Sequence, residues 1–126
     1  MEEKTLEVDS GKIIIEQGQQ GGGFFILKSG SLEVYKDDIL LAVLMYPGTI
    51  FGEMGDILSK PRTCTVKAKN KSVVVHVQAE GGVEEWVRER PDIAAQILKT
   101  LAGRLERTTQ KLVDTARDNP LWSFKK

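Results

Sequence analysis

The chain has 126 residues, enough for one domain with its own hydrophobic core and too few for a second folded unit of ordinary size. Its 18 basic residues balance its 18 acidic ones, so bulk charge attracts it neither to nucleic acid nor to an anionic membrane. The single cysteine, Cys64, excludes an internal disulfide and a cysteine-based metal cluster, and the single histidine, His76, is too little for a histidine-based metal centre.

The hydropathy pattern gives no targeting signal. The first twenty residues mix charged side chains with short apolar runs, unlike the apolar core of a signal peptide, and no later run is long enough to cross a membrane. We therefore expect a cytoplasmic protein without a membrane partner.

Residues 5–78 predict antiparallel β-structure, because short apolar runs are separated by glycine or Asx turns. The expected strands cover residues 12–17, 24–28, 31–36 and 39–45. The last of these runs is apolar almost throughout, which is typical of a strand covered on both faces. His76 is expected at the surface or rim, in phase with Val74 and Gln78.

The segment 18–23, GQQGGG, has the glycine content of a phosphate-binding loop. It lacks the Lys-Ser/Thr ending and the following helix that such a loop needs. A hairpin turn is the favoured interpretation.

Residues 51–66, FGEMGDILSKPRTCTV, form the stretch with the strongest chemical signal. Gly52 predicts a sharp turn, followed by one or two helical turns. A helix that begins directly after a glycine turn presents unpaired N–H groups and its positive dipole end, which together favour an anion such as phosphate.

Two charged side chains flank this helix. Arg62 can bind a phosphate through two parallel hydrogen bonds. Glu53 is repelled by phosphate and is better suited to accept hydrogen bonds from a sugar hydroxyl. The pattern suggests a ligand with both groups. The alternative is an ordinary strand-to-helix turn in which Glu53 and Arg62 form a structural ion pair.

Phe51-Gly52-Glu53 and Pro61-Arg62-Thr63, with Arg62 nine residues after Glu53, resemble the phosphate-binding cassette of the cyclic-nucleotide-binding domain family. Within that family the chain is most similar to the sensor half of the catabolite activator (cyclic AMP receptor) proteins. The resemblance implies a mainly β fold, an antiparallel β-roll (jelly-roll-like, a double-stranded β-helix) with a short cassette helix and C-terminal helices that include a long one. We expect a single domain over residues 1–126, with the roll at about 5–78, helices at about 83–117 and a tail at 118–126.

The resemblance also implies roles for single residues of the cassette. Glu53 would hold the ribose 2′-hydroxyl. Arg62 would hold the cyclic phosphate together with the N–H groups of two residues after the Gly52 turn, Met54 and Gly55. Thr63 would add a hydroxyl.

Two features depart from the family pattern. Asp56 stands at a cassette position that is usually apolar, so we expect it to loosen the short helix or to turn it toward solvent. The family's N-terminal helix is nearly absent, because the chain begins only a few residues ahead of Thr5.

Two helices are expected after the strands. Residues 83–90 form a short one, with Trp86 and Val87 packing inward, and Pro91 suits the first turn of the next, which runs from about Asp92 to Arg117 before Asn119-Pro120. A heptad seam follows the long helix at Ala94, Leu98, Leu101, Leu105, Thr108, Leu112 and Thr115. The seam favours a homodimer, and a helix that lies on its own roll is the alternative.

Thr108 interrupts this seam, so it either sets the register or has a polar partner. In the catabolite activator family, a Thr-Ser pair on this helix contacts the adenine amino group, one residue in its own subunit and the next across the dimer. The resemblance places Thr108 and Thr109 in those roles.

The sequence thus predicts a regulatory module that binds a cyclic nucleotide and signals through its long helix and a homodimer. Cyclic AMP is expected before cyclic GMP, although Thr63 leaves the base open, because a threonine after the arginine contacts guanine in some cyclic GMP-binding relatives. No cofactor is expected, and residues 121–126 are too short for a DNA reader. Trp122 and Phe124 are expected to dock on the domain, with base capping or a protein partner as alternatives.

A ligand-free structural or interaction module with the same fold is the rival interpretation, and Asp56 is its best argument. An enzyme is the weakest option, because no nucleophile–base pair, metal set or paired-carboxylate arrangement is visible and no catalytic residue is assigned.

Overall fold

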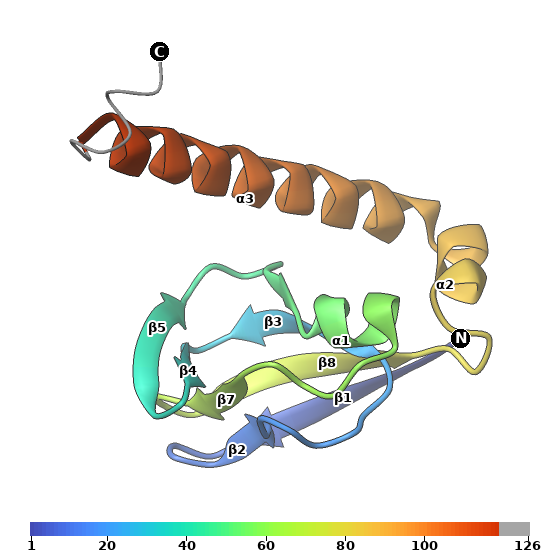
Figure 1. Cartoon of the computed structure of the whole chain (residues 1–126). Helices are drawn as coiled ribbons and strands as arrows, with labels where there is room; N and C mark the ends of the chain where they lie inside the picture. The colour runs from blue at the N-terminus through green and yellow to red at the C-terminus, as the bar shows by residue number, and fades with distance from the viewer. Residues whose placement is uncertain (119–126) are drawn as a thin grey trace. The chain divides into compact units, whose positions relative to one another are not determined.

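The computed structural model describes residues 1–118, and the chain divides into two compact units (Figure 1). The first unit, Met1–Arg90, contains all the strands of the described part and two short helices. The second begins at Pro91, and its described part is one long helix. The expectation of a single domain stays a prediction.

The strands form two antiparallel sheets of four strands each. In order across the first sheet, the strands are β1 (Glu2–Val8), β8 (Ser72–Gln78), β3 (Phe24–Ser29) and β6 (Ile50–Phe51). In order across the second sheet, they are β2 (Ile13–Ile15), β7 (Thr65–Ala68), β4 (Leu32–Lys36) and β5 (Ile39–Leu44). Because most neighbours in a sheet are distant in sequence, the chain passes back and forth between the sheets. The predicted mainly β, antiparallel roll is confirmed.

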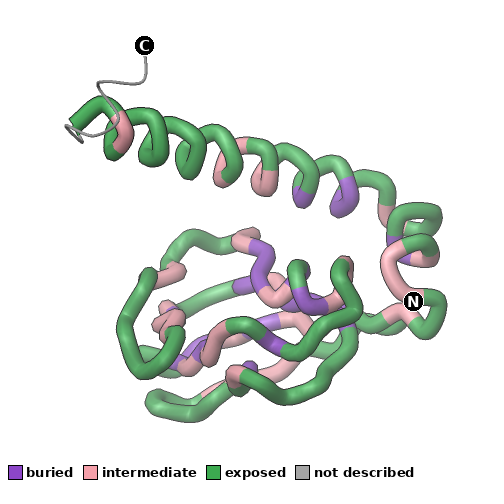
Figure 2. Tube along the Cα trace, viewed as in Figure 1, coloured by how far each residue is buried: buried purple, intermediate pink, exposed green. Residues whose placement is uncertain are grey.

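Apolar residues from both sheets form one buried core cluster, and Figure 2 marks the buried residues in purple. Its buried members are Ile15, Phe25, Leu27, Leu32, Phe51, Val66, Ala68 and Val74. Side chains alternate between the two faces of a strand, so β3 contributes Phe25 and Leu27 and β7 contributes Val66 and Ala68, each pair two residues apart. The core therefore fixes the register of the strands that carry the site.

Two expectations about the strands are wrong. Residues 39–45 are not covered on both faces, because β5 is the edge strand of its sheet and the side chains of Ile39 and Leu41 are 63% and 56% exposed. The roll also starts before residue 5, since β1 begins at Glu2 and pairs with β8 along its length. An apolar run reports a preference for burial, but it does not say which neighbour provides the cover.

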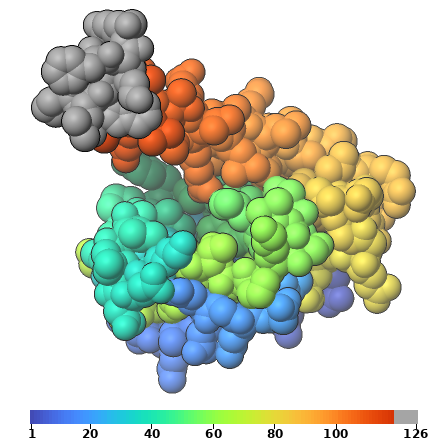
Figure 3. All heavy atoms as spheres, in the orientation of Figure 1, coloured from blue at the N-terminus to red at the C-terminus, as the bar shows by residue number. Residues whose placement is uncertain are grey.

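The expected hairpin at residues 18–23 is also wrong. β2 and β3 belong to different sheets, so the segment between them, residues 16–23, crosses from one sheet to the other; we call it the β2–β3 loop. Its Gly18 N–H donates to the Arg62 carbonyl at 2.8 Å, and the Arg62 N–H donates to the Gln19 carbonyl at 3.0 Å. In Figure 3 this blue loop lies beside the yellow-green segment that contains Arg62.

The helices agree closely with expectation. They are α1 (Glu53–Leu58), α2 (Val83–Glu89) and α3 (Pro91–Asp118). Pro91 takes the first helical position, where its missing N–H carries no penalty. Trp86 is buried as predicted, whereas Val87 is 45% exposed and does not pack inward.

The expected helix stop at Asn119-Pro120 and the docking of Trp122 and Phe124 lie outside the described residues. None of the helices within residues 1–118 combines the length and the apolar character that a membrane span requires.

Candidate functional site

The site is built on the turn that leads from β6 into α1. Gly52 adopts the left-handed conformation, with φ of 79° and ψ of 4°, and it caps the helix without a side-chain hydrogen bond. A Cβ at this position would lie 3.0 Å from Ile15 Cδ1 and 3.2 Å from Arg62 Nη1. The predicted glycine turn is therefore present, and only glycine fits both its backbone angles and its surroundings.

Arg62 brings its guanidinium to this turn from the segment that precedes β7. The side chain is buried, with 8% of the residue exposed. Its Nη1 donates to the Gly52 carbonyl at 2.7 Å, and its Nη2 donates to the carbonyls of Gly22 at 3.2 Å and Gly23 at 3.1 Å. The guanidinium thus joins the cassette to the β2–β3 loop.

Glycines surround the guanidinium on both sides. A Cβ at Gly21 would lie 3.1 Å from Arg62 Nε, and one at Gly55 would lie 3.3 Å from Nη1. Larger side chains at these positions would press on the arginine, so the glycine run of the β2–β3 loop is part of the site. Sequence reasoning missed this role, because the loop meets Arg62 only through the crossover between the two sheets.

The acceptors of Arg62 are backbone dipoles, so its positive charge is not neutralised by them. Burial lowers the pKa of the Arg62 guanidinium, and the nearby Asp56 carboxylate acts in the opposite direction. The group keeps its proton, as arginine does in proteins. A buried cation held by neutral groups attracts an anion strongly.

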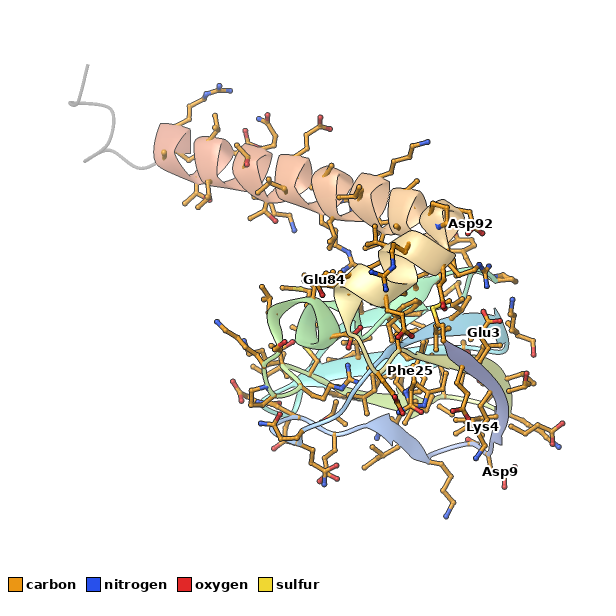
Figure 4. All side chains as sticks on the ribbon, turned by 90° about the vertical axis from the view of Figure 1, so that its right-hand side faces the viewer. Glu3, Lys4, Asp9, Phe25, Glu84 and Asp92 are labelled. Carbon is orange, nitrogen blue, oxygen red and sulfur yellow. The ribbon has the colours of Figure 1, made fainter. Side chains whose placement is uncertain are left out.

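Arg62 also lines a cavity of about 240 Å³ at the β2–β3 loop. The Phe25 ring lies 5.9 Å from Arg62 Cζ and stacks on its two cross-strand partners, Phe51 and His76. Figure 4 labels Phe25 among the strands of the roll. One wall of the cavity is therefore aromatic.

His76 lines the cavity, which is compatible with the expected surface or rim position. It is half-buried, its ring lies 4.3 Å from that of Phe25 at an interplanar angle of 6°, and its Nε2 is 3.0 Å from the Gly22 carbonyl oxygen. Val74, in the same phase of β8, is fully buried. Within the phase that we expected to face outward, Val74 thus faces the core, whereas Gln78 is exposed as expected.

The other predicted cassette residues lie on or next to α1. Glu53 is its first residue and is 3% exposed, and Gly55 is buried in the same turn, whereas Met54 is 46% exposed. Thr63 is exposed, and its hydroxyl lies 3.8 Å from Cys64 Sγ. Glu53 does not line the cavity that Arg62 lines. Its predicted contact with a sugar hydroxyl stays a prediction.

Asp56 neither loosens α1 nor turns it to solvent, contrary to expectation. It is half-buried and accepts two hydrogen bonds, from the Gly23 N–H and from the Trp86 indole. These two donors satisfy both oxygens of the carboxylate within the fold.

Thr108 and Thr109, the predicted base-contacting residues, belong to the second unit. Both are exposed on α3. Their joining the site stays a prediction.

Comparison with known protein families shows to which family the chain belongs. A family model described as "Cyclic nucleotide-binding domain" matches residues 5–83. This chain belongs to the cyclic nucleotide-binding domain family. The match runs from within β1 to the first residue of α2 and includes the cassette, and it confirms the resemblance on which the site prediction rests.

Two of the relatives are regulatory proteins by name. The CRP-like cAMP-activated global transcriptional regulator of Mycobacterium tuberculosis is 27% identical over 117 residues, which cover 88% of this chain and 51% of that protein. A cAMP-dependent protein kinase regulatory subunit of Aspergillus fumigatus is 35% identical over 98 residues, 73% of this chain and 24% of the subunit. The chain thus spans about half, or less, of these relatives.

A solved structure shows the same fold. The catabolite activator protein of Thermus thermophilus superposes with a TM-score of 0.76 at 24% identity, over 87% of this chain and 53% of that one.

Proposed function

We propose that this domain binds a cyclic nucleotide and that Arg62 binds its phosphate. The observation that carries the proposal is the buried guanidinium of Arg62, held at the cassette turn by three neutral carbonyls. A phosphodiester is an anion that can accept two parallel hydrogen bonds from such a group. Exchanging carbonyl acceptors for a charged one is favourable in a poorly solvated place.

The ribose is assigned to Glu53. As the first residue of α1, it follows the Gly52 turn directly, so its carboxylate is tied to the segment that meets Arg62. Within the proposal, the N–H groups of Met54 and Gly55 assist Arg62, and Thr63 supplies a hydroxyl. This division of roles follows the family pattern.

Cyclic AMP is the proposed ligand ahead of cyclic GMP. The transcriptional regulator and the kinase regulatory subunit described above both carry cAMP in their names, while a related kinase from Toxoplasma gondii is named cGMP-dependent. Thr108 and Thr109 are proposed to read the base. The proposed role is regulatory binding without catalysis, in the cytoplasm and without direct contact to DNA, with a protein partner as an open addition.

A homodimer through α3 is the proposed route of signalling. The helix has 28 residues, and Leu98, Leu105 and Leu112 recur every seven residues at 69%, 67% and 67% exposure. A row of exposed leucines with heptad spacing is the pattern of a coiled-coil seam, and a second copy of the same helix supplies a matching row.

A ligand-free structural or interaction module is the second candidate. The observation that favours it is the same set of carbonyl acceptors, since Arg62 already has hydrogen bonds without a ligand. In that case Arg62 and Asp56 would serve stability alone.

Isothermal titration calorimetry with cAMP, cGMP and 5′-AMP separates the two candidates. The sensor proposal predicts saturable heat with at least one cyclic nucleotide and weaker binding of 5′-AMP, whose phosphate is not closed into a ring. Absence of heat with both cyclic nucleotides at millimolar concentration, together with an unchanged melting temperature, would contradict it and support the ligand-free module.

A further inference from the structure

Asp56 lies on α1 and joins it to two other segments of the first unit. Its Oδ1 accepts a hydrogen bond from the Gly23 N–H at 3.0 Å, and its Oδ2 accepts one from the Trp86 Nε1–H at 2.9 Å. Gly23 ends the β2–β3 loop, and Trp86 lies in α2. One carboxylate thus uses both of its oxygens to connect the loop, the cassette helix and α2.

The same carboxylate is coupled to Arg62. Gly23 donates its N–H to Asp56 and accepts a hydrogen bond from Arg62 Nη2 on its carbonyl, so the two charged side chains hold the same loop residue. Asp56 is also the charged group that opposes the effect of burial on Arg62. The Asp56 carboxylate is therefore a partial counter-charge to the Arg62 guanidinium, as a bound phosphate would be.

The far end of this connection is the helix that precedes α3 in the chain. Trp86 is 2% exposed and packs edge-to-face on Phe24, with ring centroids 5.3 Å apart. α2 ends at Glu89, and α3 begins at Pro91. A change in the hydrogen bonding of the Trp86 indole therefore acts on α2, the last element of the first unit and the one that precedes α3 in the chain.

We propose that Asp56 is an internal competitor of the ligand's phosphate, and that it holds α2 to the cassette as long as no ligand is bound. This inference rests on the proposed function and adds its regulation. A phosphate beside Arg62 replaces the counter-charge that Asp56 provides and repels that carboxylate. Ligand binding therefore favours the arrangement in which the hydrogen bond between Asp56 and Trp86 is broken. Because such coupling is reciprocal, an intact Asp56–Trp86 hydrogen bond weakens ligand affinity by the same factor.

Two substitutions separate the charge of Asp56 from its hydrogen bond to the indole. Asp56→Asn removes the negative charge and one acceptor while keeping the shape of the side chain. Trp86→Phe removes the indole donor together with part of the buried ring volume, and it leaves the charge of Asp56 and a smaller aromatic ring in place. Asp9→Asn, at an exposed position in the β1–β2 turn, is the control for the change in net charge.

Calorimetry with cAMP measures the consequences. We expect Asp56→Asn to lower the dissociation constant at least about threefold, Trp86→Phe to lower it by less, and Asp9→Asn to leave it unchanged. A purely structural role for Asp56 predicts loss of melting temperature with equal or weaker binding. A purely structural role does not explain an Asp56→Asn variant that is less stable and yet binds cAMP more tightly.

The four outcomes are distinct. If the native protein and Asp56→Asn both bind, and the variant binds more tightly, the proposal and the function are both supported. If the native protein fails to bind and the variant binds, the competition is supported and the native chain is not a sensor. If both bind equally, or the variant binds more weakly, the competition is overturned while the function stands. If neither binds, both are overturned.

Fluorescence tests the release of α2 directly. In a Trp122→Phe background Trp86 is the remaining tryptophan, and its emission reports the loss of the carboxylate partner. We expect saturating cAMP to shift this emission in the protein with Asp56, and the ligand-free Asp56→Asn variant to show the shifted emission already. If saturating cAMP leaves the Trp86 emission unchanged, the proposed release of Trp86 from Asp56 is overturned.

Discussion

Arg62 is the residue on which the most other groups of the site depend. Its guanidinium contacts the cassette turn on one side and the β2–β3 loop on the other, and its backbone N–H and carbonyl are bonded to that loop as well. One side chain therefore stabilises the fold and is also the proposed ligand of the phosphate. Its removal should affect both properties, but by different amounts.

Replacing Arg62 by Ala should weaken cyclic nucleotide binding at least about 100-fold, because two charge-assisted hydrogen bonds are lost. Arg62→Lys keeps the charge without the bidentate geometry and should lose about tenfold. Calorimetry gives both values, and Arg88→Ala, at an exposed position of α2, is the control. Equal affinity of Arg62→Ala and the native protein would remove Arg62 from the binding role.

Among the elements, the β2–β3 loop is bonded to both charged side chains described above, Arg62 and Asp56. It connects the two sheets and supplies two of the three backbone carbonyls that accept hydrogen bonds from the Arg62 side chain. Its Gly23 N–H also donates a hydrogen bond to Asp56. Gly23 has a positive φ of 79°, and a Cβ there would collide with the Val77 carbonyl oxygen. The conformation of the loop at Gly23 is thus fixed by its packing against the fold.

Gly23→Ala should therefore destabilise the protein by more than about 3 kcal/mol, since backbone strain and a backbone collision act together. Gly18→Ala is the matched control: its φ of 87° gives the same strain, and nothing lies within 4 Å of its added Cβ. It should lose only about 1 kcal/mol. Urea unfolding gives both free energies, and equal losses would show that the collision is relieved.

The sequence predicted the elements well, because their signals are local. The Gly52 turn, the short helix after it and the Pro91 start of α3 all depend on neighbours within a few residues. The cassette motif also located Arg62 at the turn. The missed features are the crossover of the β2–β3 loop, the exposure of β5 and the burial of Val74, each of which depends on which strands become neighbours. Asp56 was misjudged for the same reason, since its donors come from Gly23 and Trp86.

At the scale of the whole molecule, the question is what the exposed seam of α3 contacts. Three leucines seven residues apart remain more than 60% exposed, which is unfavourable for a helix that stays single in water. Pairing with a second copy would cover them.

Leu105→Glu should accordingly convert a dimer into a monomer, because it places a charge at the middle of the seam. Lys99→Glu introduces the same side chain outside the seam and should leave the dimer intact. Sedimentation velocity at micromolar concentration distinguishes the two states. A native protein that sediments as a monomer would contradict the proposed dimer and leave the binding site untouched.

A crystal structure of the protein grown with cAMP tests the proposed roles of Arg62 and Glu53. We expect the Arg62 guanidinium to leave one or more of the carbonyls of Gly22, Gly23 and Gly52 for the cyclic phosphate, and Glu53 to accept a hydrogen bond from the ribose 2′-hydroxyl. A nucleotide bound elsewhere, with Arg62 still on all three carbonyls, would contradict these roles.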